Sequence, residues 1–191
     1  IVCALVKKHY KGDLHTWSIG LEGSEDLKYA QKVADFSLDG ARGNSGAILA
    51  QFFVGLSEGL EGKSKMSTKD FSVAFNIASQ NAWNALSDPK EGTILTVFKD
   101  LADFLVEYTL NPDNDDFLPL MDASLKRAQK SLDNTPMQMQ LLRRAGVVDA
   151  GAQGFIDLLK GINDFIQSGT IRDLGDIINT PKEFEELENN H

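Results

Sequence analysis

Apolar residues recur at three- and four-residue intervals along most of the chain, which is the spacing of one face of an α-helix. The pattern is clearest in residues 45–60, 68–86 and 93–108, each of which carries one apolar stripe. No segment shows convincing two-residue alternation, so no half-buried strand is predicted. The chain is therefore predicted to be nearly all helical, and its short connections favour antiparallel neighbouring helices.

Turn and capping residues mark where these helices are expected to begin and end. Ser67 or Thr68 is suited to cap one helix, and Pro89 ends it because proline disfavours helix in the residue before it. Pro136 is expected to break the sixth helix, leaving a short helix after it. The helix that follows residue 24 is expected to bury Leu27, Ala30, Val33, Ala34 and Leu38.

The periodic pattern divides the chain into three parts. Residues 24–168 form the predicted helical domain, long enough to bury a full core. Residues 1–23 are interpreted as the end of a helix followed by an irregular, glycine-spaced segment. Residues 169–191 are acidic and are interpreted as a last short helix or a linker. Because the chain begins at Ile1 rather than methionine, we expect it to be part of a longer protein.

Composition narrows the class of protein. The formal net charge of −9 argues against a nucleic-acid partner, because binding the phosphate backbone requires a concentrated basic surface. Cys3 is the single cysteine, which excludes an intramolecular disulfide and fits a reducing cytoplasm. No apolar run approaches the roughly 20 residues of a membrane-spanning helix, and no signal peptide is recognisable. A cytoplasmic protein without a membrane span is expected.

Residues 40–46 form a glycine-rich loop that runs directly into a predicted helix. Such a loop brings backbone N–H groups close to a ligand, and the helix start adds unpaired donors and the positive end of the dipole. Asn44 and Ser45 are suited to cap this helix and to donate to phosphate oxygens. The alternative is a plain helix corner whose glycines allow close packing. The spacing alone leaves both interpretations open.

Two further loops also open helices, at residues 91–93 and 146–151. Counted from Ile1, the three loops follow the second, fourth and seventh helices, so simple alternation does not bring them together. A missing or broken element would restore the parity, and their convergence is a hypothesis. In that case Asp149 is available to a metal ion, to a ligand or to the backbone of a neighbouring loop; otherwise it is a helix cap. Arg42 and Arg144 are either solvated or salt-bridged, which is the usual case, or they are phosphate ligands.

Other candidate sites are weaker. Cys3 and the dispersed histidines have no metal-ligand spacing, and Ser45 has no obvious histidine partner for a hydrolase triad. Asp113, Asp115 and Asp116 lack the glycine and glutamate of a calcium-binding loop and are interpreted as a solvated turn. No metal ligand and no catalytic residue is assigned.

Taken together, the three loop motifs resemble one family, the nucleotide-binding L-type domain shared by dihydroxyacetone kinases and bacterial fatty acid kinases. The motifs are Gly-Ala-Arg-Gly-Asn-Ser-Gly at 40–46, Glu-Gly-Thr-Ile-Leu-Thr-Val at 91–97 and Gly-Val-Val-Asp-Ala-Gly at 146–151. They occur in the family's order, and the resemblance covers residues from about 25 to 168. Their wording is more similar to the fatty acid kinase branch.

The resemblance implies an antiparallel eight-helix up-and-down barrel with ADP or ATP and Mg²⁺ at one end. It places Ser45 and its two neighbours at the phosphates, Thr93 near them and Ile94 against the adenine. The full set of implied nucleotide contacts is Asn44, Ser45, Gly46, Thr93, Ile94, Arg144, Asp149, Ala150 and Gly151. Catalysis in such a site comes from positioning and charge neutralisation.

One departure separates this chain from the family pattern. The Asp-Gly-Asp-Thr-Gly loop that binds the metal in the family is not present in the 191 residues. The first hypothesis is a kinase domain that phosphorylates an acceptor, a fatty acid carboxylate, presented by a DegV-like acyl-binding domain or subunit. The second is a catalytically silent helical domain that binds or regulates a partner. The third is a dihydroxyacetone kinase L-type subunit, and a homodimer is left open.

Overall fold

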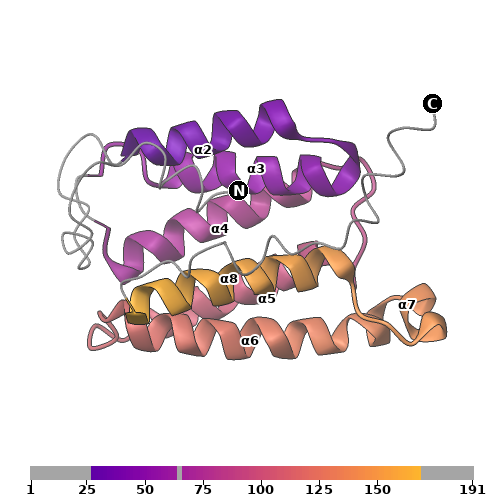
Figure 1. Ribbon diagram of the computed structural model, residues 1–191. Coiled ribbons are helices and arrows are strands. Elements are labelled where there is room, and N and C mark those ends of the chain that lie inside the picture. The colour runs from indigo at the N-terminus through magenta and orange to yellow at the C-terminus, as the bar shows by residue number, and fades with distance from the viewer. Residues whose placement is uncertain (1–26, 64–65, 169–191) are drawn as a thin grey trace.

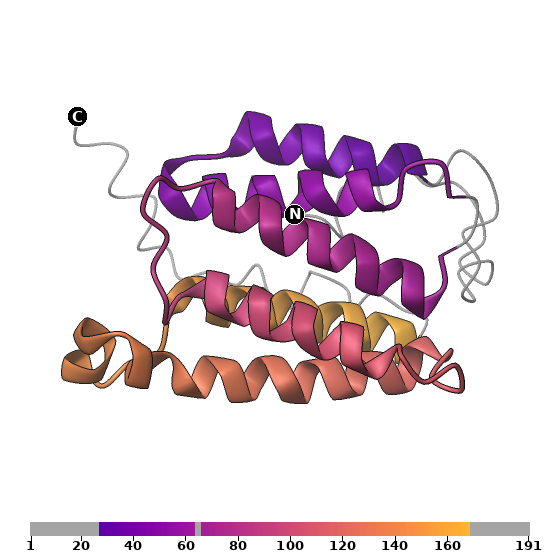
Figure 2. The same ribbon diagram turned by 180° about the vertical axis from the view of Figure 1, so that it is seen from behind.

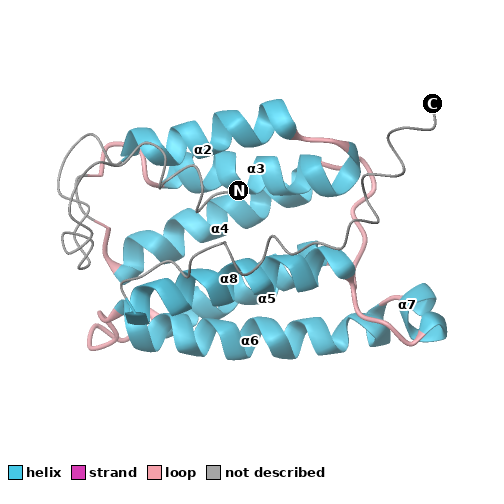
Figure 3. Ribbon diagram, viewed as in Figure 1, coloured by secondary structure: helices cyan, strands magenta, loops and turns pink. Residues whose placement is uncertain are grey.

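The computed structural model describes residues 27–63 and 66–168. All regular secondary structure in this part of the chain is helical (Figures 1 and 3). The all-helical prediction is confirmed. The predicted elements at 1–23 and 169–191 lie outside the described residues. The helices are α2 (Leu27–Gly40), α3 (Gly43–Gly59), α4 (Thr68–Asn84), α5 (Ile94–Tyr108), α6 (Phe117–Gln138), α7 (Gln140–Ala145) and α8 (Ala150–Ser168).

The long helices run antiparallel to their neighbours in the chain and form two groups of three. Helices α2, α3 and α4 lie together in the upper half of Figure 1, and α5, α6 and α8 lie together in the lower half. Figure 2 shows the same grouping from behind, with α4 next to α5. The packing of α4 against α5 joins the two groups. None of the helices in the described ranges is long and apolar enough to cross a membrane.

Four phenylalanines from four helices fill the space between the two groups. The rings of Phe52 on α3 and Phe98 on α5 are stacked, with their centroids 4.3 Å apart. Phe155 on α8 meets Phe98 edge to face at 4.7 Å, and Phe75 on α4 meets Phe52 in the same way at 5.0 Å. All four side chains are buried, so this cluster connects both halves through the hydrophobic effect and favourable ring geometry.

Glycine allows α3 and α4 to approach each other closely. A Cβ atom at Gly55 would lie 2.7 Å from the Cα atom of Ala78, well inside van der Waals contact. Gly59 faces Ala74 in the same way one turn further along. The two backbones therefore meet along a surface of small residues, which holds α3 in a fixed position against α4.

The prediction that the sixth helix breaks at Pro136 is wrong, because α6 continues to Gln138. A proline in a helix leaves the carbonyl four residues earlier without its usual N–H donor. Here that carbonyl belongs to Leu132, and the Thr135 hydroxyl donates to it at 2.8 Å. The side chain before the proline thus replaces the missing hydrogen bond, and the break falls three residues later at Met139.

Two other local predictions have different outcomes. Ser67 caps α4 as one of the two candidates: its hydroxyl accepts from the Asp70 N–H at 3.1 Å, and Asp70 accepts from the Ser67 N–H in return. Helix α4 ends at Asn84, five residues before Pro89. The prediction that Leu38 is buried is wrong, because 45% of its surface is exposed near the end of α2.

Candidate functional site

The three glycine-containing loops lie at the same end of the bundle (Figure 1). They connect α2 to α3, α4 to α5, and α6 to α8 by way of α7. Helix α7 has only six residues and does not cross the bundle, so it does not change the parity of the long helices. Helix α7 is therefore the broken element that brings the three loops to the same end.

The first loop leaves the start of α3 open. Arg42 precedes the helix in an extended conformation, and no side chain of the described residues caps the first turn. The prediction that Asn44 or Ser45 caps this helix is therefore wrong. Both are exposed residues within its first turn. The Arg42 guanidinium donates to the carbonyl oxygens of Ala41 at 2.7 Å and Asp39 at 3.2 Å, so it bonds the loop backbone. The first-turn N–H groups of α3 have no partner within their own helix.

In the second loop, threonine side chains hydrogen-bond backbone groups of the loop and of the helix start. Thr93 caps α5: its hydroxyl accepts from the Leu95 N–H at 3.3 Å and donates to the Lys90 carbonyl at 2.8 Å. The Thr96 hydroxyl accepts from the Gly92 N–H at 2.9 Å and donates to Glu91 at 2.7 Å. Sequence reasoning missed Thr96, although a buried hydroxyl one turn into a helix is a recognisable candidate for bonding the preceding loop.

The third loop is joined to the second by Asp149. Its Oδ1 atom accepts from the Ala152 N–H at 2.8 Å, which caps α8, and from the Ile94 N–H at 2.9 Å, at the start of α5. Its own N–H donates to the Thr135 hydroxyl at 3.2 Å. Of the partners considered for Asp149, the structure places it on a helix start and on the backbone of a neighbouring loop. Among the implied contacts, Ala150 is exposed here, whereas Gly151 is partly buried.

The absence of a side chain at Gly92 allows the second loop to approach the end of α6 and the start of the third loop closely. Its φ of 78° lies in the left-handed region that favours glycine. A Cβ atom there would lie 2.9 Å from the Met139 Cβ and 3.0 Å from the Thr135 carbonyl oxygen. Arg144 lies in the last turn of α7, where its side chain is exposed. Gly146, with a φ of 67°, ends that helix.

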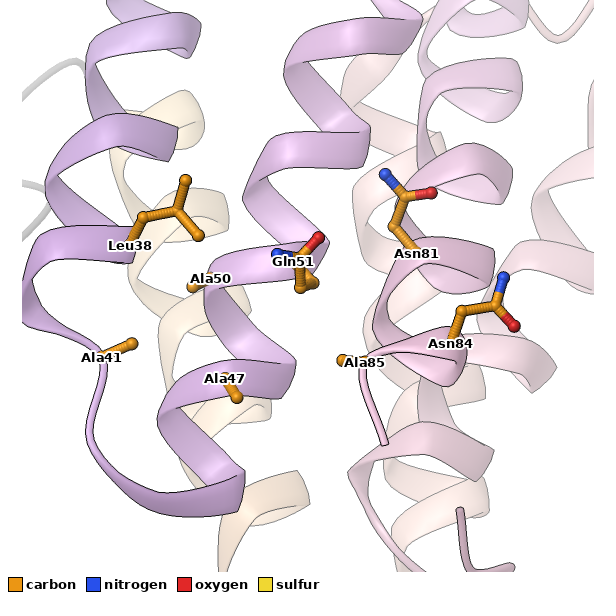
Figure 4. Close-up of a pocket in the computed structure, with 8 residues that line it drawn as sticks. All are labelled: Leu38, Ala41, Ala47, Ala50, Gln51, Asn81, Asn84 and Ala85. Atoms are coloured by element: carbon orange, nitrogen blue, oxygen red, sulfur yellow. The ribbon is translucent and has the colours of Figure 1, made fainter. Parts of the chain in front are cut away.

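A shallow pocket of about 500 Å³ lies behind the first loop, between α2, α3 and α4. Figure 4 shows the amide side chains of Asn81 and Asn84 on α4 at one side of it, Leu38 on α2 at the other, and Gln51 on α3 between them. Asn81 donates to Glu58 at 2.9 Å, so part of this polar lining is already bonded. Alanines make up the rest of the lining, which is why the surface is hollow there.

The described residues contain no group of three histidine, cysteine, aspartate or glutamate side chains that fits a metal ion. Asp149 is the carboxylate that joins two of the loops, and its Oδ1 atom is occupied by two backbone N–H groups. Magnesium prefers several carboxylate or water oxygens in octahedral geometry. The described residues thus contain no preformed group of three protein ligands for Mg²⁺.

The described residues form an all-helical domain in which three loops that precede helices lie at one end. The start of α3 has no side-chain cap there, and Asp149 joins the starts of α5 and α8. The chain belongs to the DAK2 domain family, whose model matches residues 19–164. DAK2 domains are nucleotide-binding domains of the dihydroxyacetone kinase family.

The chain is also similar to longer bacterial proteins. It is 40% identical over 124 residues to an uncharacterized protein of Staphylococcus epidermidis, covering 65% of this chain and 22% of that protein. It is 40% identical over 134 residues to an uncharacterized protein of Staphylococcus saprophyticus, covering 70% of this chain and 24% of that protein. The chain thus spans about a quarter of the length of the curated relatives it matches.

Proposed function

We propose that the chain is the ATP-binding domain of a kinase that phosphorylates an acceptor presented by a second domain or subunit. The acceptor is a fatty acid carboxylate held by a DegV-like acyl-binding module, and the product is an acyl phosphate. Membership of the DAK2 family and the residue sequences of the three loop motifs support this interpretation. The observation that carries it is the uncapped start of α3, placed at the same end as two structured loops.

In this proposal the phosphates bind at the first turn of α3. Its N–H groups lack partners within the helix, and the helix dipole favours an anion there. Ser45 and Asn44 are exposed in that turn, so their side chains add donors. Gly46 lies so close to Ala41 that a Cβ atom would be 3.2 Å from the Ala41 backbone, which keeps the loop tight against the helix.

The second and third loops form the opposite side of the proposed nucleotide site. Thr93, Ile94, Ala150 and Gly151 lie at the starts of α5 and α8. The Ile94 side chain is only 7% exposed, so a contact with adenine is limited to that exposed edge. Arg144 is exposed on α7, and in this proposal its guanidinium binds a phosphate from this side. Such a site accelerates phosphoryl transfer by positioning and by electrostatic stabilisation.

The exposed apolar residues at the end of α6, on α7 and in the loop before α8 support docking of the acceptor-presenting partner at this end. Met137, Leu141 and Val147 are 71%, 75% and 51% exposed, although apolar side chains of this size are usually buried. Arg143 and Arg144 lie among them, and residues 134–148 contain no acidic residue in a chain of net charge −9. An acceptor must reach the terminal phosphate, so a partner with an acidic and apolar surface has to cover this end.

Isothermal titration of ADP and of ATP into the 191-residue chain tests the proposal, with and without Mg²⁺. We expect saturable binding that Ser45→Glu weakens, because a carboxylate in the first turn of α3 occupies the anion site. Pro119→Glu is the matched control, since it adds the same charge at the third residue of α6, at the opposite end. The absence of heat from both nucleotides, or equal loss in both variants, would contradict the proposal.

A second function is favoured by the absence of a three-ligand metal group among the described residues. A DAK2 domain without metal ligands is suited to a regulatory or partner-binding role with no turnover. Nucleotide binding without phosphoryl transfer in the complete protein, supplied with an acyl-loaded DegV-type protein, would favour this alternative over the kinase.

A further inference from the structure

One oxygen atom joins two helix starts that are distant in the sequence. Asp149 Oδ1 accepts from the N–H of Ile94, 55 positions away on α5, and from the N–H of Ala152 on its own helix. The distances of 2.9 and 2.8 Å are those of strong bonds between a backbone N–H and a carboxylate. A negative charge is stabilising at both positions, because each is the positive end of a helix dipole. We call this arrangement the Asp149 link.

The surroundings of the Asp149 link leave little room for a different geometry. A Cβ atom at Gly151 would lie 3.3 Å from Asp149 Oδ1 and 3.7 Å from the Ile94 Cβ, so glycine allows α5 and α8 to approach. The Asp149 N–H donates to the hydroxyl of Thr135, which is fully buried on α6. Three helices therefore meet at a single residue, which is itself partly buried.

We propose that Asp149 is a positioning residue: it holds the α4–α5 and α6–α8 loops together, and nucleotide affinity depends on this separation. On this view Asp149 acts through the backbones of Ile94 and Ala152 and contacts neither the nucleotide nor a metal ion. The proposal rests on the proposed function, because it concerns the wall of the same site. It replaces the nucleotide contact that the sequence resemblance implies for this residue.

The two substitutions Asp149→Asn and Asp149→Ala separate positioning from direct contact. Asparagine keeps an oxygen that accepts both N–H bonds but loses the charge that a metal ion requires, whereas alanine loses both. Asp116→Ala is the matched control, because Asp116 caps α6 at the opposite end by accepting from the Leu118 N–H at 2.9 Å. The readouts are the Kd for ADP with and without Mg²⁺, and amide hydrogen exchange at Ile94 and Ala152.

We expect Asp149→Ala to weaken ADP binding at least tenfold, equally with and without Mg²⁺. Asp149→Asn is expected to stay within about threefold of the unchanged chain, and Asp116→Ala to leave the affinity unchanged. Exchange at Ile94 and Ala152 becomes faster in Asp149→Ala and not in Asp116→Ala.

Two results would overturn the positioning role. The first is an asparagine variant as weak as the alanine variant, particularly if the loss appears only with Mg²⁺, because that indicates direct contact through charge. The second is an alanine variant with unchanged affinity. If the unchanged chain binds no ADP, the proposed function fails separately, and the exchange rates at Ile94 and Ala152 alone decide whether Asp149 holds the loops.

Discussion

The start of α3 and the starts of α5 and α8 lie at the same end of the bundle but differ in how their backbone donors are satisfied. At α3 no side chain within residues 27–63 and 66–168 caps the first turn, and Asn44 and Ser45 are exposed. At α5, Thr93 and Asp149 accept from the first two N–H groups, and Asp149 also caps α8. One side of the end is therefore open to an anion, and the other is a structured wall.

This difference shows that a glycine-rich loop before a helix is not by itself an anion site. The unpaired donors at a helix start are available only if no nearby carboxylate or hydroxyl accepts from them. Asp149 lies 55 positions from Ile94 in the sequence and reaches it only because α8 packs beside α5. Substitutions in the wall are therefore expected to change stability most, and substitutions at the open start to change mainly nucleotide affinity.

Gly92→Ala is expected to have the largest effect on stability, lowering the free energy of unfolding by about 3 kcal/mol. It combines a left-handed backbone with a clash against Met139 and the Thr135 carbonyl. Gly43→Ala is the control on the open side: its φ is 63°, but a Cβ atom would meet nothing within 4 Å. There only the backbone strain remains, about 1 kcal/mol. Equal urea midpoints for the two variants would contradict the close packing of the wall.

Thr135→Val should lower the free energy of unfolding by about 1–3 kcal/mol, because it leaves one buried and one partly buried backbone group without partners. The Leu132 carbonyl loses its donor, which Pro136 cannot replace, and the Asp149 N–H loses its acceptor. The control is Thr109→Val at the other end of α5, where the lost bond to the Leu105 carbonyl is only partly buried. Chemical denaturation compares the two; a larger loss in the control would be inconsistent with this account.

Ser45→Glu should have opposite effects on stability and on nucleotide affinity. A carboxylate in the first turn of α3 stabilises the helix by about 0.3–1 kcal/mol through the dipole. The same charge should weaken ADP binding about tenfold, because it repels the phosphates from that turn. Thermal unfolding without nucleotide and titration with ADP measure the two effects. Lower stability together with unchanged affinity would show that this helix start is not an anion site.

A pH-dependent effect on stability is expected at the far end, where Asp70 completes the capping box of Ser67 at the start of α4. Hydrogen bonds from Lys63 and from the Ser67 side chain and backbone lower the pKa of Asp70 from 3.8 to about 2. Its contribution to stability is complete above the unfolded pKa and is lost as the pH falls from about 4 through 2. The difference in urea midpoint between the chain and Asp70→Asn should shrink over this range. A difference that stays constant would argue against the lowered pKa.

Much of the fold was predictable from local pattern. The apolar stripes of α5 and α6 identify the residues that are buried, and the Ser67 cap follows from its position before α4. The errors occurred where tertiary contacts or side-chain bonds changed a local preference. Pro136 stays within α6 because Thr135 replaces the lost bond, and Leu38 is exposed because α2 packs mainly along α3 in the described part.

The candidate site was predictable in location but not in the roles of its residues. The sequence by itself determined the helical class, the three helix-opening motifs and the family, because periodicity and loop chemistry are local properties. Only the tertiary structure decided that α7 does not cross the bundle, that α3 remains uncapped, and that Asp149 bonds Ile94. These outcomes depend on which backbone groups meet after packing, and groups 55 residues apart become neighbours only when the helices that carry them are in contact.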